Sequence, residues 1–485
     1  MTTNAENFCS DSDLTCDADS VASRFELASF LAASGKEADR EQAKAIFLQI
    51  INEVPDSLGA WVNLGILLFE TGYTSAACTA FSAAVSYHPQ DATAHVYLGN
   101  VLLYRDDLPA AKKHFEIALQ INHALAGAHR GLASIYKRQG DEESAALHRK
   151  LGYQGYALST LSCYGHGKPI ELLILASAQD GNIPWRLLID RSVFHSTILA
   201  VEYFDGPLPD HQLVFNAIGD ADLCRDALEK SVHLLKKSQA PVINFPEAVL
   251  QTGRVANAVR LAALPGVISP RMSLVVKTDF YAGKEILAQR PILLRSPGFH
   301  GGNYFVRVES ENELQSAFKE LPGDSLLAIE FLDSRSEYAL FRKYRVMFIN
   351  GALYPIHLAI SARWNVHYFS SDMEENEQYR NEEAFFLNDF RACLGNAAIS
   401  ALKRISLTLD LDYCGIDFGI DVNGNILLYE ANPTMIINPP THEKHWDYKR
   451  AAIANALAAT NRMFVERANR NRDWNTGVMP CEQHK

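Results

Sequence analysis

The pattern of apolar and small residues repeats every 34 residues in the first third of the chain. Such a period is typical of helix-turn-helix repeats, in which small residues let paired helices approach and aromatic side chains fill between them. We therefore predict three to four helical repeats over residues 21–155, the first of them degenerate. The matching columns are Leu64-Gly65, Leu98-Gly99 and Leu132-Ala133; Ala77, Ala111 and Ala145; and Phe47, Phe81 and Phe115, with Pro55 and Pro89 closing successive units.

Beyond residue 165 the pattern changes to short apolar runs separated by amphipathic segments. The apolar runs at residues 171–177, 197–204, 212–217 and 241–245 are bounded by turn residues, which predicts buried strands. Residues 222–237 and 251–265 are predicted to be helices. This alternation of strands and helices indicates a small α/β layer with a largely parallel sheet.

Two asparagine-glycine pairs predict β-hairpins in the last third of the chain. Asn350-Gly351 and Asn423-Gly424 each lie between apolar strands, and this dipeptide favours the two-residue type I′ turn, which needs positive φ at both positions. If Asn423-Gly424 forms such a turn, Asp417 lies directly opposite Glu430. Asn432 then shares the face of Glu430, because side chains alternate along a strand.

Carboxylates that oppose each other across two strands repel, since their Cβ atoms are only about 5 Å apart. A bound hard cation removes this conflict, because Mg²⁺ takes a few carboxylate or amide oxygens and leaves its other positions to phosphates and water. Asp417, Glu430 and Asn432 are therefore predicted metal ligands for Mg²⁺, with Mn²⁺ as an alternative. The plainer interpretation is an exposed hairpin edge with solvated carboxylates.

Cationic side chains and glycines precede this hairpin. Arg295 ends a predicted strand within residues 291–308, and His300, Gly301 and Gly302 follow in a turn. Glycine lets backbone N–H groups approach phosphate oxygens, and arginine supplies charge. In the other hairpin, Lys343 and Arg345 share one strand face, which favours a role toward phosphate or a developing oxyanion.

Composition sets outer bounds on function. A chain of 485 residues is too long for a single hydrophobic core, so several domains are expected. A net charge of −12 argues against nucleic acid or an acidic membrane as partner. Eight cysteines without a CxxC pair are typical of reduced thiols, and no segment is predicted to span a membrane or to act as a signal peptide. We expect a cytoplasmic protein.

The order of elements over roughly residues 165–465 resembles the ATP-grasp superfamily, and is most similar to the branch of the ribosomal-protein glutamate ligases and glutathione synthetases. The N-terminal period resembles the tetratricopeptide repeat. The resemblance implies that Asp417, Glu430 and Asn432 hold Mg²⁺ ions that bridge the phosphates of ATP. It further implies phosphate contacts from Arg254 (or Arg260) and Arg295, where the family usually has lysines; a mobile loop at His300, Gly301 and Gly302; adenine contacts from Glu330 and Leu332; and ribose contacts from Glu337.

The expected fold class is multi-domain, with an all-α tetratricopeptide-like solenoid followed by an α/β and α+β ATP-grasp fold. The predicted boundaries are a disordered leader at 1–20, the repeats at 21–155, a pre-ATP-grasp α/β domain at 165–245, a first ATP-grasp subdomain at 246–325, a second subdomain with the metal site at 326–468, and a flexible tail at 469–485.

The resemblance implies an ADP-forming carboxylate–amine ligase that acts through an acylphosphate, with Lys343 and Arg345 as catalytic residues. We expect His357, Arg363 and Trp364 near the acceptor substrate, although a solvated loop is the plainer account of these side chains and of the acidic run after them. Two other hypotheses remain: a nucleotide-binding scaffold with an inactive ATP-grasp module, and phosphoryl transfer without ligation. The repeats are predicted to hold a peptide or protein substrate, a partner, or a second copy in a homodimer.

Overall fold

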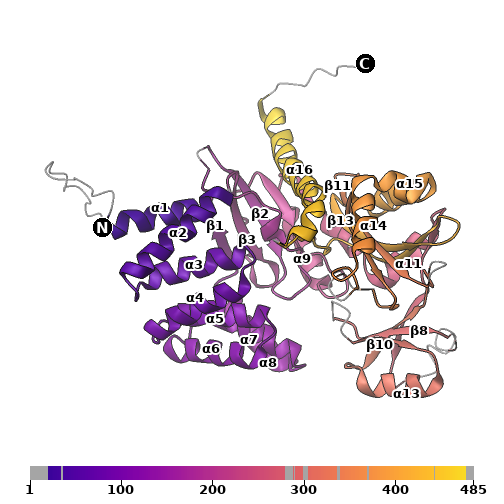
Figure 1. Cartoon of the computed structure of the whole chain (residues 1–485), viewed down its shortest axis with the longest axis horizontal. Helices are drawn as coiled ribbons and strands as arrows, with labels where there is room; N and C mark the ends of the chain where they lie inside the picture. Colours follow the sequence, from indigo (N-terminus) through magenta and orange to yellow (C-terminus); the bar gives the residue numbers. More distant parts are fainter. Residues whose placement is uncertain are drawn as a thin grey trace. The chain divides into compact units, whose positions relative to one another are not determined.

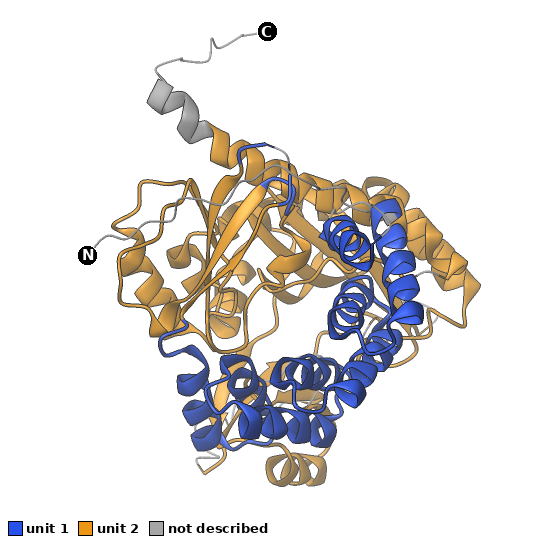
Figure 2. Ribbon diagram, turned by 90° about the vertical axis from the view of Figure 1, so that its left-hand side faces the viewer, with its two compact units in different colours: residues 1–156, 164–168, 191–193 blue, residues 157–163, 169–190, 194–485 orange. Residues whose placement is uncertain are grey.

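In the computed structural model the chain forms two compact units (Figures 1 and 2). Predictions for the leader before residue 20, for His300, Gly301, Gly302 and Glu337, and for the last nine residues lie outside the described part. The described residues are 20–33, 37–165, 167–278, 288, 290–298, 304–335, 339–366, 368, 371–441 and 443–476.

The first unit comprises residues 1–156, 164–168 and 191–193, and its described part is a series of helices that resembles a tetratricopeptide solenoid (Figure 2). Successive helices pack in pairs, as the 34-residue period predicts, and the predicted degenerate first repeat is a helix pair as well. The helices are α1 (Val21–Ala33), α2 (Glu37–Glu53), α3 (Leu58–Glu70), α4 (Thr74–Tyr87), α5 (Ala92–Tyr104), α6 (Leu108–Ile121), α7 (Ala126–Arg138) and α8 (Glu142–Tyr153).

Small residues in the repeats make room for buried phenylalanine rings. A Cβ atom on Gly65 would lie 2.6 Å from the ring of Phe81, and one on Gly99 would lie 2.7 Å from the ring of Phe115. Real Cβ atoms do not approach other atoms so closely, so glycine is required where these rings are buried. The glycines of the Leu-Gly column are therefore explained by close packing within the helix pairs.

A second repeated feature is a pair of facing histidines. The Nδ1 atoms of His95 and His114 lie 2.9 Å apart, and those of His129 and His148, one repeat later, lie 2.9 Å apart. The Nε2 atoms of His95 and His129 contact the carbonyl oxygen six residues earlier, at 3.2 and 3.1 Å. Since a carbonyl only accepts, each Nε2 carries its proton, and a neutral His95 or His129 offers a lone pair at Nδ1.

The second unit begins with a sheet in the order β1-β3-β2-β4-β5. Strands β2 to β5 are parallel to their neighbours and β1 is antiparallel, which confirms the predicted, largely parallel layer. The predicted helix at 251–265 is shorter than expected: it is α11, which a turn at residues 251–253 separates from the preceding short helix α10. The elements are β1 (Leu158–Leu161), β2 (Ile170–Ala176), β3 (Phe194–Ala200), β4 (Leu213–Asn216), α9 (Arg225–Leu235), β5 (Val242–Ile243), α10 (Pro246–Leu250) and α11 (Arg254–Ala262), with short 3₁₀ turns at Trp185–Leu187 and Val201–Tyr203.

Two further sheets complete this unit. The smaller one, ordered β7-β10-β8-β9, is antiparallel and carries α13, while the larger one is ordered β12-β11-β13-β14-β6. Their elements are β6 (Val267–Ile268), β7 (Met272–Val276), β8 (Ile292–Arg295), β9 (Phe305–Val308), α13 (Glu311–Glu320), β10 (Ser325–Glu330), β11 (Phe341–Ile349), β12 (Ala352–Ser361), α14 (Glu377–Asn388), α15 (Phe390–Leu409), β13 (Tyr413–Ile420), β14 (Ile426–Asn432), η4 (Lys444–Lys449) and α16 (Arg450–Thr476).

The two predicted hairpins form different turns. Asn350 and Gly351 have φ of 49° and 77°, as a type I′ turn requires. In the other hairpin only Gly424 has positive φ, and the N–H of Gly424 donates to the carbonyl of Asp421, so the loop has three residues and the prediction of a type I′ turn is wrong. The Asp421 carboxylate accepts from the N–H groups of Asn423 and Asn425, which stabilises this longer loop.

The longer loop shifts the register by one residue, and a bulge at Tyr429 shifts it back. Ile420 pairs with Ile426, but Asp417 still pairs with Glu430. The predicted carboxylate pair is therefore present through two compensating irregularities.

Candidate active site

Four polar side chains stand in one row across the larger sheet. The register of β12, β11, β13 and β14 pairs His357 with Arg345, Arg345 with Asp417, and Asp417 with Glu430. Directly paired residues of antiparallel strands place their side chains on the same face. The row therefore places an imidazole, a guanidinium and two carboxylates, in this order, on one face of the sheet.

Asp417 lies at the centre of a buried ion cluster. The residue is 4% exposed, and its carboxylate accepts hydrogen bonds from Arg345 Nε at 2.7 Å and Nη2 at 2.9 Å. Lys343 Nζ lies 3.5 Å from the same group. Burial alone would raise the pKa of Asp417, but the charges of Arg345 and Lys343 outweigh it and hold this pKa well below its ordinary value.

Glu430 pairs with a cation from another element. Arg254 Nη2 lies 2.6 Å from Glu430 Oε1, and Asn432 Nδ2 donates to the same oxygen at 2.8 Å. Asn257 of α11 donates to the carbonyl of Ala431, which fixes α11 against β14. Burial would raise the pKa of Glu430, but Arg254 and then Arg295 lower it.

The two candidate phosphate arginines of the sequence prediction converge with Glu430. Burial and the charge of Arg254 lower the pKa of Arg295 to about 10, and Glu430 offsets this only in part. Arg260, the alternative to Arg254, instead donates to the carbonyl of Thr408 at 2.7 Å. Arg254 and Arg295 thus bring positive charge together at one place, where an anionic ligand would relieve their mutual repulsion.

A cavity of about 240 Å³ lies between the smaller sheet (β7-β10-β8-β9) and the larger sheet (β12-β11-β13-β14-β6), beside the segment 331–334 that follows β10; we call it the hinge cavity. The ion cluster forms one wall, and apolar and aromatic side chains make up most of the remaining lining. It is lined by Arg254, Pro270, Met272, Leu293, Arg295, Phe305, Ile329, Glu330, Phe331, Leu332, Ser334, Phe341, Lys343, Arg345, Trp364, Asn365, Val366, Asp417, Leu428, Tyr429 and Glu430.

Glu330 and Leu332, the two residues predicted to contact adenine, both line this cavity, but they differ in the hydrogen-bonding groups that remain available. The Glu330 carboxylate accepts from the backbone N–H of Arg271 at 3.0 Å and from its Nε at 3.3 Å, so it is already paired. Leu332 makes no backbone hydrogen bond within the described part of the chain. The backbone of Leu332, rather than the Glu330 side chain, is the group available to the edge of a planar ring.

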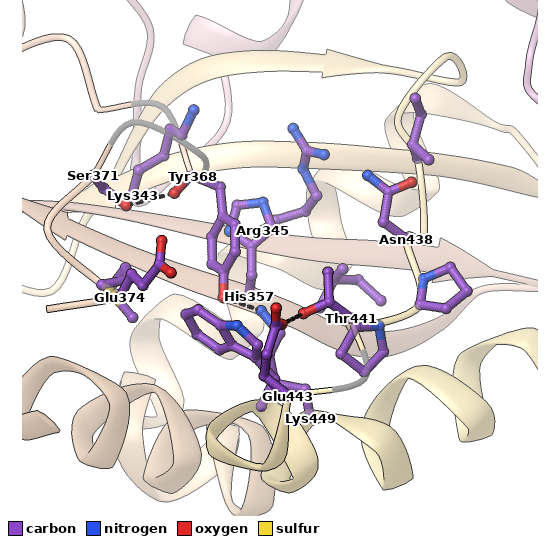
Figure 3. Close-up of a pocket in the computed structure, with 16 residues that line it drawn as sticks. Lys343, Arg345, His357, Tyr368, Ser371, Glu374, Asn438, Thr441, Glu443 and Lys449 are labelled. Atoms are coloured by element: carbon purple, nitrogen blue, oxygen red, sulfur yellow. Dashed lines mark hydrogen bonds between the residues drawn. The ribbon is translucent and has the colours of Figure 1, made fainter. Parts of the chain in front are cut away.

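A second cavity, of about 310 Å³, shares Lys343 and Arg345 with the hinge cavity and continues past His357 to Pro439 and Pro440; we call it the proline cavity (Figure 3). The segment 434–440, which follows β14, supplies Ile436, Asn438 and the two prolines. The remaining lining residues are Ile356, Tyr368, Ser371, Met373, Glu374, Thr441, Glu443, Trp446 and Lys449.

The three residues predicted to contact the acceptor substrate do not lie together. His357 lines the proline cavity, but Trp364 lines the hinge cavity, where its ring packs edge-on against Phe305 at 5.3 Å. Arg363 is exposed and lines neither cavity. The predicted grouping is therefore corrected: the loop after β12 carries Trp364 across to the other cavity.

A buried cluster behind the proline cavity was not predicted from the sequence. The Glu383 carboxylate is fully buried and accepts from Lys449 Nζ at 2.9 Å, Tyr448 OH at 2.5 Å and Tyr368 OH at 3.1 Å. Lys449 also lies over the Tyr368 ring, 3.8 Å from its centroid. Glu383 was expected in a solvated acidic run; its spacing from Tyr379, Phe386 and Leu387 on the apolar side of α14 was the overlooked signal.

The predicted metal ligands offer two carboxylates and one amide. Within the described residues, no group of three or more histidine, cysteine, aspartate or glutamate side chains is arranged to hold a metal ion. The Asn432 side-chain oxygen accepts from the Thr434 N–H at 2.9 Å, and its amide nitrogen contacts Glu430. The three side chains thus supply carboxylate and amide oxygens, and each of them has a protein partner in this structure.

No protein-family model matches the chain, and no curated protein is similar to it in sequence. Solved structures of MamA, a tetratricopeptide-repeat protein, match about a quarter of the chain. A crystal structure of MamA is 20% identical, with 24% of this chain and 68% of that chain covered and a TM-score of 0.23. MamA from Desulfovibrio magneticus RS-1 is 20% identical over 27% of this chain and 73% of that chain, with a TM-score of 0.25.

One negative finding concerns membranes. Among the helices of the described residues, none combines the length and the apolar character needed to cross a bilayer.

Proposed function

We propose that the protein is an ATP-dependent carboxylate–amine ligase that forms an amide through an acylphosphate. The observation that carries the proposal is the row His357–Arg345–Asp417–Glu430, whose cation lines two adjoining cavities. A ligase of this kind needs a nucleotide site and an acceptor site that meet where a phosphoryl group is transferred. Lys343 and Arg345, which line both cavities, would stand at such a junction.

The hinge cavity suits ATP. Apolar side chains such as Met272, Leu293 and Ile329 flank the space for a planar base, and the Leu332 backbone is available to its edge. At the polar end, Arg254 and Arg295 are the phosphate-binding residues, since arginine binds phosphate oxygens through two parallel N–H groups. Pairing with phosphate would also restore the ordinary pKa of Arg295.

Asp417, Glu430 and Asn432 would hold Mg²⁺, or Mn²⁺ in its place, next to these arginines. When bound, the ion neutralises phosphate charge and polarises the transferred phosphoryl group. The positive charges of Arg345 and Arg254 lower the pKa values of Asp417 and Glu430. Both carboxylates are therefore kept ionised, as metal ligands must be.

The remaining steps use residues of this chain at the cavity junction. Lys343 and Arg345 orient the substrate carboxylate, whose oxygen attacks the γ-phosphorus of ATP and releases ADP. An amine then attacks the acylphosphate carbon, forming the C–N bond while the C–O bond to phosphate breaks. Arg345 stabilises the tetrahedral oxyanion, because only two of its five N–H donors point to Asp417.

The test is ADP release from MgATP in the presence of mixed carboxylates and amines. We expect turnover that Asp417→Ala and Glu430→Gln reduce at least a hundredfold and that Glu320→Gln, at an exposed helix end, leaves unchanged. Untargeted metabolite and peptide comparison of wild-type and Glu430→Gln cells would then identify the product by its added mass.

Two alternatives give other outcomes in the same assay. Nucleotide binding without turnover of any carboxylate and amine mixture would favour a scaffold whose ATP-grasp-like region binds nucleotide only. A stable phosphorylated product would favour simple phosphoryl transfer.

For the repeats, we propose that they hold an extended polypeptide segment, either of a substrate or of a partner protein. A dimeric mass in solution would favour a second copy instead.

A further inference from the structure

His357 is a buried polar side chain in the wall of the proline cavity, and it lacks a hydrogen-bond partner among the described residues. It is 7% exposed, and its Nδ1 atom is buried without a hydrogen bond. Neither ring nitrogen bonds to any residue in the described part of the chain. A buried polar group without a partner is costly, so such a group in a cavity wall indicates a ligand that completes its hydrogen bonding.

The surroundings of His357 favour an uncharged ring. Its centroid lies 4.8 Å from that of Tyr368, and Arg345 is its cross-strand partner, so the imidazole sits between the two (Figure 3). Burial, then the charge of Arg345, with smaller effects of Lys449 and Lys343, lowers the pKa of His357 well below its ordinary value; Asp417 opposes this only in part. A neutral imidazole offers one lone pair, which makes it an acceptor for a proton.

Apart from Glu374, the other ionisable groups around this cavity are already engaged. Lys449 and Tyr368 are bound to Glu383, Lys343 pairs with Asp417, and the Glu443 carboxylate accepts from the Thr441 hydroxyl. Glu374 stands on an exposed part of the wall. His357 is therefore the neutral, unengaged base beside the residue that orients the acyl group.

We propose that His357 accepts the proton of the attacking amine, a step that rests on the proposed ligase function. The amine nitrogen forms a bond to the acylphosphate carbon, the bond from that carbon to the phosphate oxygen breaks, and phosphate leaves with the electron pair. The nitrogen proton passes to the imidazole. Because the cations around His357 disfavour its charged form, the ring then returns the proton to the departing phosphate or to water.

Two small nucleophiles separate this role from a structural one. Hydroxylamine is largely uncharged at neutral pH, whereas methylamine is protonated and must lose a proton before it attacks. Wild-type protein, His357→Gln and the exposed-site control His233→Gln are each given MgATP, a mixture of amino acids and dicarboxylic acids, and equal amounts of both nucleophiles. Hydroxamates, N-methylamides and ADP are measured at pH 7, and cooperative thermal unfolding verifies folding, with His357→Asn as a second variant.

We expect the ratio of N-methylamide to hydroxamate to fall at least tenfold in His357→Gln and to match the wild-type ratio in His233→Gln. An unchanged ratio in folded His357→Gln or His357→Asn would overturn the assignment, because a packing defect lowers both products together. A wild-type protein that captures hydroxylamine but not methylamine would overturn it as well. Absence of ADP and of both products from the wild-type protein would instead contradict the ligase function itself, and the assignment with it.

Discussion

Arg345 holds the carboxylate of Asp417 with two parallel hydrogen bonds, from Nε to Oδ1 at 2.7 Å and from Nη2 to Oδ2 at 2.9 Å. Bidentate pairs of this kind are strong and set the orientation of both groups. Breaking a buried pair by removing one partner costs far more than the pair itself contributes, because a charge remains buried.

Arg345→Gln should lower the free energy of unfolding by about 3 kcal/mol, since Asp417 keeps only Lys343 at 3.5 Å. The double variant Arg345→Gln/Asp417→Asn should recover part of that loss. Chemical denaturation measures both, with Arg225→Gln on an exposed helix face as the control. Because the folded pKa of Asp417 is depressed, the pair stabilises above the ordinary carboxyl pKa, and this stabilisation is lost as the pH falls below about 4. Equal stabilities for wild type and Arg345→Gln would contradict the description of the cluster.

Glu383→Gln should destabilise the protein by about 3–5 kcal/mol, because the Lys449 ammonium then remains buried without its counter-charge. Replacing both members, as in Glu383→Leu/Lys449→Met, should restore much of the stability. Denaturant unfolding measures the stability of both variants. Glu375→Gln, which removes the charge of an exposed glutamate, is the control. A loss in the double variant as large as in the single one would show that packing, not charge, dominates this cluster.

Gly131→Ala should lower the unfolding temperature of the helical repeats. A Cβ at this position would lie 2.3 Å from the Phe115 ring, and overpacking of this kind costs about 1–3 kcal/mol, more than the gain in helix propensity. Gly167→Ala is the control, since nothing lies within 4 Å of its added Cβ. Far-UV circular dichroism on heating measures the effect, and equal transitions for the two variants would contradict the packing argument.

The facing histidines predict a pH dependence in the repeats. Burial, and next the neighbouring His95 or His129, lowers the pKa of His114 and of His148 below 6.5. The unfolded chain then binds more protons than the folded one, so stability is full above about pH 6.5 and falls as the pH drops below it.

The double variant His114→Gln/His148→Gln should therefore lose less stability between pH 7 and pH 5.5 than the wild type. Lys112 and Lys113, whose charges contribute to these shifts, stay in place in this comparison. His123→Gln, at an exposed histidine, should keep the wild-type profile. Identical pH profiles for all three proteins, measured by thermal unfolding, would contradict the prediction.

Local patterns predicted much of the fold because they encode neighbours along the chain. The 34-residue columns predicted the helix pairs, and the Asn350-Gly351 pair predicted its turn. The pairing of Asp417 with Glu430 was predicted from a wrong turn: the Asp421 carboxylate favours a three-residue loop, and the bulge at Tyr429 restores the pairing. Bulges depend on packing across strands, which the sequence of one hairpin does not reveal.

The site was less predictable where it joins distant segments. Arg254 reaches Glu430 from a helix more than 170 residues earlier, and Lys449 reaches Glu383 from a 3₁₀ turn 66 residues later. Neither the residue type of Lys449 nor its spacing from other residues predicts that it lines the proline cavity. Such convergence is a property of tertiary packing, and only the helical position of Glu383 hinted at its burial.

The most direct test of the account is calorimetric titration of the protein with a non-hydrolysable ATP analogue and Mg²⁺. We predict one site per chain, with affinity reduced at least tenfold in Arg254→Gln/Arg295→Gln and unchanged in Arg225→Gln. Absence of binding to the wild-type protein, or equal binding by all three proteins, would contradict the assignment of the hinge cavity to ATP.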